Sequence, residues 1–163
     1  MPPVSPLAPS SFPDLPKVAG VRFATVAAGI KYKGRTDVML AELAEGSSVA
    51  GVYTKSATRS AAVLDCQAKT GGTAAGKAAI LVNSGNSNAF TGRNGIASVE
   101  AITAAAGKAF GIDPARIFTS STGVIGEPLP HDRIIDKLNE LGAGLSDDGI
   151  GAAAKAIMTT DTF

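Results

Sequence analysis

Apolar positions in the first half of the chain recur in short runs bounded by Gly, Ser and Thr, a pattern typical of β-strands. Residues 20–28 (GVRFATVAA) and 37–46 (DVMLAELAEG) predict two strands, and 47–54 (SSVAGVYT) a third, in a hairpin with the second. Residues 61–69 (AAVLDCQAK) predict a weaker fourth strand. Residues 77–85 (KAAILVNSG) are almost continuously apolar, as expected of a strand that is buried on both faces.

Helical periodicity begins in the second half. Residues 94–110 carry apolar side chains at i, i+3, i+7 and i+10, which fall on one face of a helix. These are Val99, Ile102, Ala106 and Ala109. Gly111 stands where helices often stop, and Asp113-Pro114 predicts a turn. Residues 115–122 (ARIFTSST) then predict a short strand.

Two further helices are predicted in the C-terminal part of the chain. The apolar face of the first is made of Ile134, Ile135, Leu138 and Leu141. Gly142 ends that helix, and Ser146 caps the next one, with Asp147 and Asp148 in its first turn, where negative charge is favourable. This last helix runs to about Met158. Strands followed by interleaved helices predict the α/β class, a mixed sheet with packed helices.

Composition excludes several functions. The chain has 163 residues, enough for one domain or one large piece of a bigger one, and is 45% hydrophobic with no Trp. Its 15 basic and 14 acidic residues are dispersed, so nucleic acid and anionic membranes are poor partners. No apolar run approaches the ~20 residues of a membrane span. Residues 1–18, rich in Pro and Ser, predict an arm without signal-peptide features, and 19–163 the domain proper.

The single cysteine, Cys66, forms no internal disulfide and belongs to no metal-binding Cys pattern. A reduced, cytoplasmic setting and no metal are therefore expected. In its strand-like run Cys66 is interpreted as buried filler rather than as a nucleophile. The segment 71–79 (GGTAAGKAA) has the Gly and Lys spacing of a phosphate-binding loop, but Ala78 replaces the required Ser or Thr. It also precedes a strand instead of following one, so it is interpreted as a hairpin connection.

One hypothesis is a serine hydrolase. Residues 85–89 (GNSNA) nearly match a G-x-S-x-G nucleophile elbow around Ser87, and Asp113 and His131 follow in the acid-then-base order. Against it, the final Gly is Ala89, and Gly and Asn continue to position 95 where a helix should begin. The simpler interpretation is an asparagine-rich loop whose amides bond its own backbone. A binding loop at a strand end stays open as a third possibility.

Residues 120–126 (SSTGVIG) combine hydroxyls with flexible glycines, so their donors can converge on one oxygen atom, as an oxyanion site requires. A serine-threonine turn is the alternative, and spacing alone favours the turn. Residues 156–163 (AIMTTDTF) place two hydroxyls and an acid after a helix, where they can bind a polar ligand. Composition and periodicity therefore leave open a non-catalytic small-molecule binding module. The chain stops there without a closing signal, so it is expected to be part of a longer protein.

Five stretches taken together resemble one family. In order they read VAAGIKYKGRTDVMLAEL, AGVYTKSATRSAAV, AILVNSGNSNAFTG, SSTGVIGEPLP and AIMTTDTF. They are similar to the N-terminal part of bifunctional ornithine acetyltransferase, also called glutamate N-acetyltransferase. The resemblance covers about residues 20–163, and the combination of NSGNSNAFTG, STGVIG and AIMTTD is specific.

The resemblance implies transfer of an acetyl group from N-acetylornithine to glutamate, in arginine biosynthesis. Some members also use acetyl-CoA as the donor, and no cofactor is implied. The precursor of such an enzyme cuts itself into an α and a β chain. The threonine exposed at the start of the β chain is the nucleophile, its own amine serves as base, and the reaction is ping-pong.

The resemblance also assigns residues. Thr122, through its hydroxyl, and Gly123, through its backbone N–H, correspond to the oxyanion hole, and Thr159 to a substrate-binding position. The nucleophile is not in this chain, and the end of the α chain and the whole β chain are expected beyond Phe163. The resemblance further implies a sandwich-like α/β assembly in which the α and β chains share a core, and pairing into an α2β2 heterotetramer.

Overall fold

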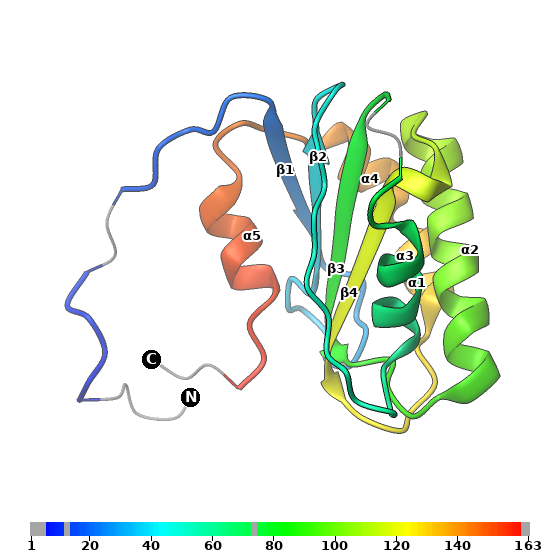
Figure 1. Ribbon diagram of the computed structural model, residues 1–163. Coiled ribbons are helices and arrows are strands. Elements are labelled where there is room, and N and C mark those ends of the chain that lie inside the picture. The colour runs from blue at the N-terminus through cyan, green and yellow to red at the C-terminus, as the bar shows by residue number, and fades with distance from the viewer. Residues whose placement is uncertain (1–5, 12–13, 73–74, 161–163) are drawn as a thin grey trace.

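A computed structural model describes residues 6–11, 14–72 and 75–160 of the chain. Its centre is a four-stranded mixed sheet in the order β1-β2-β3-β4 (Figure 1). The strands are β1 (Val21–Val26), β2 (Val38–Leu43), β3 (Ala78–Asn86) and β4 (Ile117–Val124). The first two pairs are antiparallel and the third, β3 with β4, is parallel. The predicted α/β class with a mixed sheet is confirmed.

Helices cover both faces of this sheet, as Figure 1 shows. They are α1 (Ala61–Lys69), α2 (Gly92–Phe110), the 3₁₀ helix η1 (Pro114–Arg116), α3 (His131–Ile135), α4 (Leu138–Ala143) and α5 (Ile150–Ala156). Helix α2 makes the crossover that a parallel pair of strands requires. Helices α2, α3 and α4 lie over one face, α1 packs against β4 and α2, and α5 packs on the opposite face against β1 and β2.

The main core lies between the sheet and α2, α3 and α4. Its strand residues are Ala24, Val26, Val38, Leu40, Ala79, Leu81 and Ile117. Its helix residues include Ile102, Ala106, Ile134, Leu138 and Leu141. Burying one such leucine or isoleucine contributes about 1.5–3 kcal/mol. The predicted helix faces are therefore confirmed, except at Ala109, which is exposed.

The end of α2 also follows the prediction. Gly111 adopts a left-handed conformation, with φ of 64°, and its N–H bonds the carbonyl of Gly107. Asp113 then caps the short η1 helix by accepting a hydrogen bond from the N–H of Ala115 at 2.9 Å. Strand β4 begins directly after this turn, so the predicted strand over residues 115–122 is correct in kind and displaced by two residues.

The prediction of a strand over residues 61–69 is wrong, because this segment is helix α1. Ser60 caps its N-terminus by accepting from the N–H of Val63, and Asp65 forms an i,i+4 ion pair with Lys69 at 2.7 Å. Both are local helix signals that the apolar alternation around Cys66 concealed. The segment 71–79 therefore connects a helix to a strand and is no hairpin; residues 73 and 74 lie outside the described residues.

The strand predicted over residues 47–54 is also absent, and the hairpin with it. Strand β2 is bonded to β1 on one side and β3 on the other, so it has no edge left for a third partner. Tyr53 instead donates from its hydroxyl to the carbonyl of Cys66 at 3.1 Å, which holds the segment against α1.

Two helix boundaries differ from the sequence prediction. The single helix expected before Gly142 is divided into α3 and α4, and α4 ends at Ala143 with Gly144 as its C-cap. Ser146 does not cap α5: the cap is Gly149, while the Ser146 hydroxyl accepts from the N–H of Asp148 at 3.2 Å. The backbone of Ser146 is held in a bridge to Phe23 of β1, so the helix begins only after this contact.

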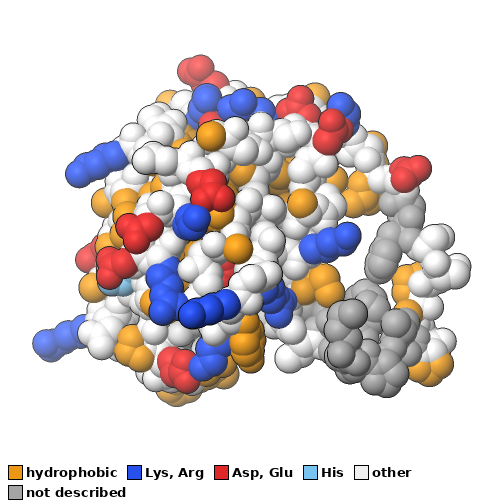
Figure 2. All heavy atoms as spheres, turned by 180° about the vertical axis from the view of Figure 1, so that it is seen from behind, with side chains coloured by type: hydrophobic (Ala, Val, Ile, Leu, Met, Phe, Trp, Pro, Cys, Tyr) orange, Lys and Arg blue, Asp and Glu red, His pale blue; other side chains and the backbone are white. Residues whose placement is uncertain are grey.

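Charges are interspersed over the surface. Figure 2 shows acidic and basic side chains next to one another across the back of the molecule. Within the described part of the chain, no helix combines the length and apolar character needed to cross a bilayer. The described residues before β1 lie in no helix or strand, and Lys17 of this segment pairs with Asp148 at 2.9 Å. The separate arm over residues 1–18 stays a prediction.

Glu42 of β2 provides a pH-dependent contribution to stability. It faces Arg22 across the strand pair, with an N–H···O distance of 3.1 Å, and Lys77 at 3.4 Å. Burial raises the pKa of this carboxyl, but the hydrogen bond and charge of Arg22, together with Lys77, outweigh burial, so the pKa is lowered. The stabilisation is therefore complete above the ordinary carboxyl pKa of about 4.3 and disappears as the pH falls through the lowered value.

Glu42→Gln is expected to lower the free energy of unfolding by about 1 kcal/mol at pH 7, because a largely buried, charge-assisted hydrogen bond is weakened. The difference should be smaller at pH 3, below the ordinary carboxyl pKa of about 4.3. Denaturant unfolding at both pH values measures it. Glu140→Gln is the matched control, because the Glu140 carboxylate pairs with Lys137 while 60% exposed. An equal loss for Glu42→Gln at pH 3 and pH 7 would contradict the assignment.

Candidate functional site

The carboxyl ends of β3 and β4 form one edge of the sheet. Because these strands are parallel, the segments that follow Asn86 and Val124 emerge side by side. The loop between β1 and β2 reaches the same end, since Val38 at the start of β2 is paired with Asn83. Ligands of open α/β sheets bind at such strand ends. The predicted site motifs, residues 83–92 and 120–126, are both located here.

Gly123 lies in close contact with β3. It is paired with Gly85, and its φ of +132° belongs to the region that side chains rarely adopt. A Cβ atom at Gly123 would stand 2.6 Å from the backbone nitrogen of Asn86. Only glycine therefore permits this approach of the two strands, which answers why the motif contains glycine at this position.

The asparagine-rich loop is held by its own amides. The Asn86 amide oxygen accepts from the N–H of Asn88 at 2.7 Å, and the Asn83 amide donates to the carbonyl of Asn86 at 2.8 Å. Asn88, fully buried at a φ of 47°, donates to the carbonyl of Gly95 at 3.1 Å. Asparagine tolerates this left-handed conformation. Residues 83–86 belong to β3 and Gly92 begins α2, so the loop predicted over residues 83–92 is limited to residues 87–91. The prediction that the asparagine amides bond nearby backbone groups is confirmed.

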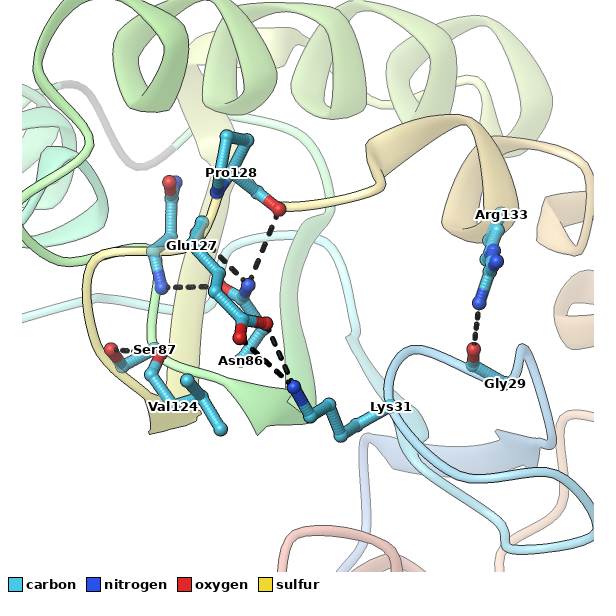
Figure 3. A network of polar contacts seen from close by, with 9 residues as sticks. Gly29, Lys31, Asn86, Ser87, Val124, Glu127, Pro128 and Arg133 are labelled. Carbon is cyan, nitrogen blue, oxygen red and sulfur yellow. Dashed lines mark hydrogen bonds and ion pairs between the residues drawn. The ribbon is translucent and has the colours of Figure 1, made fainter.

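A second set of contacts joins this loop to the segment after β4 (Figure 3). Asn86 donates to the carbonyls of Glu127 and Pro128, at 3.0 and 3.4 Å. The Glu127 carboxylate in turn accepts from Lys31 of the β1–β2 loop at 2.9 Å, and this contact raises the pKa of Lys31. Both ends of the ion pair are partly exposed, so water and salt screen it and it adds little to stability. Asn86 is the buried centre that fixes the segment following Gly123.

Thr122 shares a face of the sheet with the end of α5. Its register partner is Ser84, and partners in parallel strands direct their side chains to the same face. The Ser84 hydroxyl donates to the carbonyl of Ala156, the last residue of α5, at 2.7 Å. Thr122 is half-buried, and within the described residues its hydroxyl has no hydrogen-bond partner.

Thr159 follows α5 by three positions and is half-buried. The structure therefore brings the chain segment that carries Thr159 to the face on which Thr122 lies. The remainder of the terminal motif, residues 161–163, lies outside the described residues. Ser84 and Asn86, which organise these segments, were not identified from the sequence, although both belong to the NSGNSN run that was singled out.

The residues of the serine hydrolase hypothesis do not meet. The Ser87 hydroxyl donates to the carbonyl of Val124 at 2.8 Å, whereas His131 contacts Ser98 through Nδ1 at 3.0 Å. The Asp113 carboxylate caps η1. Ser87 lacks both the base and the acid that a triad requires.

Cys66 is half-buried in α1, and its thiol donates to the carbonyl of Thr119 at 3.2 Å. Burial raises the pKa of this thiol, so little thiolate exists near neutrality. It lines a cavity of about 310 Å³ between α1, the segment around Tyr53 and β4. Across residues 6–11, 14–72 and 75–160, no three His, Cys, Asp or Glu side chains gather as a metal site would need.

Comparison with known proteins decides the family. The sequence profile described as the ArgJ family matches residues 22–163. The chain belongs to the ArgJ family. It is 64% identical over 160 residues to the arginine biosynthesis bifunctional protein ArgJ of Ruegeria pomeroyi, covering 98% of this chain and 39% of that protein. The ArgJ protein of Bradyrhizobium diazoefficiens is 53% identical over 161 residues, 98% of this chain and 38% of its own length.

Solved ArgJ structures have the same fold. The ornithine acetyltransferase of Mycobacterium tuberculosis, crystallised with ornithine, superposes with a TM-score of 0.80 and 34% identity, over 89% of this chain and 78% of that one. The ArgJ protein of Bacillus halodurans gives a TM-score of 0.78 and 30% identity, over 89% and 75%. The family resemblance stated from the motifs is confirmed. The chain spans about 39% of the first curated relative.

Proposed function

We propose that this chain is the α subunit of an acetyltransferase that moves an acetyl group from N-acetylornithine to glutamate in arginine biosynthesis. The observation that carries the proposal is the placement of the STG motif, in a chain of the ArgJ family. Thr122 lies near the end of β4 with a hydroxyl that bonds no other described residue, and Gly123 is fixed there by its contact with Gly85.

In this proposal the two residues stabilise the negative charge that develops on the acetyl oxygen. A threonine at the start of the β chain attacks the acetyl carbonyl, and its amine accepts the hydroxyl proton. Thr122, through its hydroxyl, and Gly123, through its backbone N–H, donate to the oxygen of the tetrahedral intermediate. Ornithine leaves, and the amine of glutamate then attacks the acetyl-enzyme. Thr159 contributes to binding the amino-acid substrate.

The partner follows from the length of the relatives. The chain matches about two fifths of ArgJ proteins, so the remaining part of the same precursor supplies the β chain. Self-cleavage, pairing into α2β2 and a cytoplasmic location complete the proposal, with acetyl-CoA as a possible second acetyl donor and no cofactor.

The test begins with the whole protein. Intact mass and N-terminal sequencing of every species that co-purifies with this chain should give a second chain that starts with threonine. The purified complex should convert N-acetylornithine and glutamate to ornithine and N-acetylglutamate. A single uncut chain that does not transfer the acetyl group would overturn the proposal. That result would favour the alternative that the protein is a non-catalytic binding module.

Ser87→Ala separates this function from a serine hydrolase. We expect the variant of the whole protein to retain acetyl transfer within about tenfold of the wild-type rate, because its hydroxyl only donates one hydrogen bond to Val124. Steady-state rates of ornithine release measure it. Abolished activity in a complex that still assembles would favour Ser87 as the nucleophile.

A further inference from the structure

Ser84 is the most deeply buried hydroxyl beside the proposed site. Only 1% of the residue is exposed, and its hydroxyl crosses 72 positions of sequence to reach the carbonyl of Ala156. Its backbone N–H donates to the carbonyl of Asp37 at 2.8 Å. One residue of β3 therefore joins β4, the start of β2 and the end of α5.

The contacts of Asp37 make this junction rigid. The Asp37 carboxylate is 3% exposed and accepts from the N–H groups of Ala28 and Ile30, at 2.7 and 2.6 Å. Those bonds fix the first part of the β1–β2 loop against the sheet. Later in the same loop, Arg35 donates from its guanidinium to the carbonyl of Met158, the residue before Thr159.

Two donors from separate elements thus hold the chain just before Thr159. Ser84 bonds the carbonyl of Ala156, and Arg35 bonds the carbonyl of Met158. Ala156 is the last residue of α5 and Met158 follows its C-cap, Ile157, so no later turn of helix satisfies either carbonyl. The segment before Thr159 is therefore held by Ser84, which is the register partner of Thr122 in the neighbouring strand, and not by α5 alone.

We propose that Ser84 and Arg35 are positioning residues that set the distance between the Thr159 segment and Thr122. The inference rests on the proposed function, and it deepens it by naming what aligns the substrate-binding part of the chain with the oxyanion donors. Ser84 touches no reacting atom in this role. It acts through the backbone carbonyl of Ala156.

Ser84→Ala in the whole protein tests this role. Because Thr159 binds substrate in the ground state and the transition state alike, loss of its alignment should raise KM for N-acetylornithine with little change in kcat. We expect an increase of KM of about tenfold, within the range that a misplaced binding group produces. Thr122→Ala should give the opposite pattern, a lower kcat with little change in KM.

Ser98→Ala is the matched control. Ser98 is also buried, at 3% exposure, and its hydroxyl also donates to a backbone carbonyl, that of Asn94 at 2.9 Å inside α2. Both variants lose one buried serine-to-carbonyl bond, and Ser98→Ala also loses the contact with His131, so a purely structural effect should be at least as large in Ser98→Ala. An increase of KM shared by Ser84→Ala and Ser98→Ala would overturn the proposal, as would unchanged kinetics or a loss confined to kcat.

Arg35 supplies a second variant, should Ser84→Ala fail to fold. Arg35 is half-buried on a loop, so Arg35→Ala is expected to fold and to raise KM in the same direction. Arg35→Lys keeps one donor and should restore part of the affinity. Failure of the proposed function is recognised separately, because the wild-type protein would then transfer no acetyl group at all. Active wild-type protein with an unchanged KM in Arg35→Ala would overturn the positioning role alone.

Discussion

Thr122→Ala in the assembled protein is expected to lower kcat for acetyl transfer by about 100- to 1,000-fold, the usual loss when one oxyanion donor is removed. The reason is geometric. The Thr122 hydroxyl has no hydrogen-bond partner among the described residues, whereas the hydroxyls of Ser84, Ser87 and Ser121 each donate to one. Its removal should therefore leave packing and assembly intact and affect the charged intermediate. Single-turnover release of ornithine measures the acetylation step directly.

Two variants control this experiment. Thr122→Ser keeps the hydroxyl and should retain most of the rate. Ser121→Ala changes the adjacent residue, whose hydroxyl donates to the Asn83 amide oxygen at 2.7 Å from the opposite face of the strand. It should cost stability of about 1 kcal/mol and little activity. Full rates in Thr122→Ala would remove Thr122 from the oxyanion hole.

Gly123→Ala is expected to prevent stable folding of the β3–β4 edge, at a cost of about 3 kcal/mol or more. Two penalties combine. The φ of +132° is strained for any residue with a Cβ, and overpacking against the backbone of Gly85 and Asn86 cannot be relieved by turning a side chain. We therefore expect little soluble protein, with a lowered unfolding temperature in whatever is recovered.

Gly126→Ala separates the two penalties. Gly126 also has a positive φ, of 85°, but nothing lies within 4 Å of the Cβ that it would gain. Its replacement carries backbone strain alone, about 1–3 kcal/mol. Thermal unfolding of the two variants, measured side by side, gives the cost of the close strand contact. Equal unfolding temperatures would show that the contact with β3 does not require glycine.

The Gly123 contact also shows where sequence analysis stops. The motif SSTGVIG predicts donors, but Gly85 and Gly123 become neighbours only when β3 and β4 pair in parallel through α2. From the sequence alone, a turn was the favoured interpretation of residues 120–126. The structure places most of this stretch, through Val124, in strand β4. No local sequence pattern indicates that β3 is the strand that pairs with β4.

The strand predictions for residues 47–54 and 61–69 are wrong for a related reason. Each has apolar residues in strand-like runs, and periodicity alone cannot tell a short apolar strand from a helical segment. The capping contact of Ser60 and the ion pair of Asp65 with Lys69 decide for helix in the second segment. In the first, the occupied edges of β2 leave no partner for a strand.

The sequence by itself determined β1, β2, β3 and α2, the α/β class and the family, because these depend on local periodicity and on ordered motifs. It also determined which residues deserved attention, among them Thr122, Gly123 and Thr159. Only the tertiary structure decided that Ser84 bonds Ala156 and that Asn86 holds the segment at Glu127, far along the chain. Such contacts form between groups whose separation in sequence carries no periodic signal, so they appear only once the sheet has brought them together.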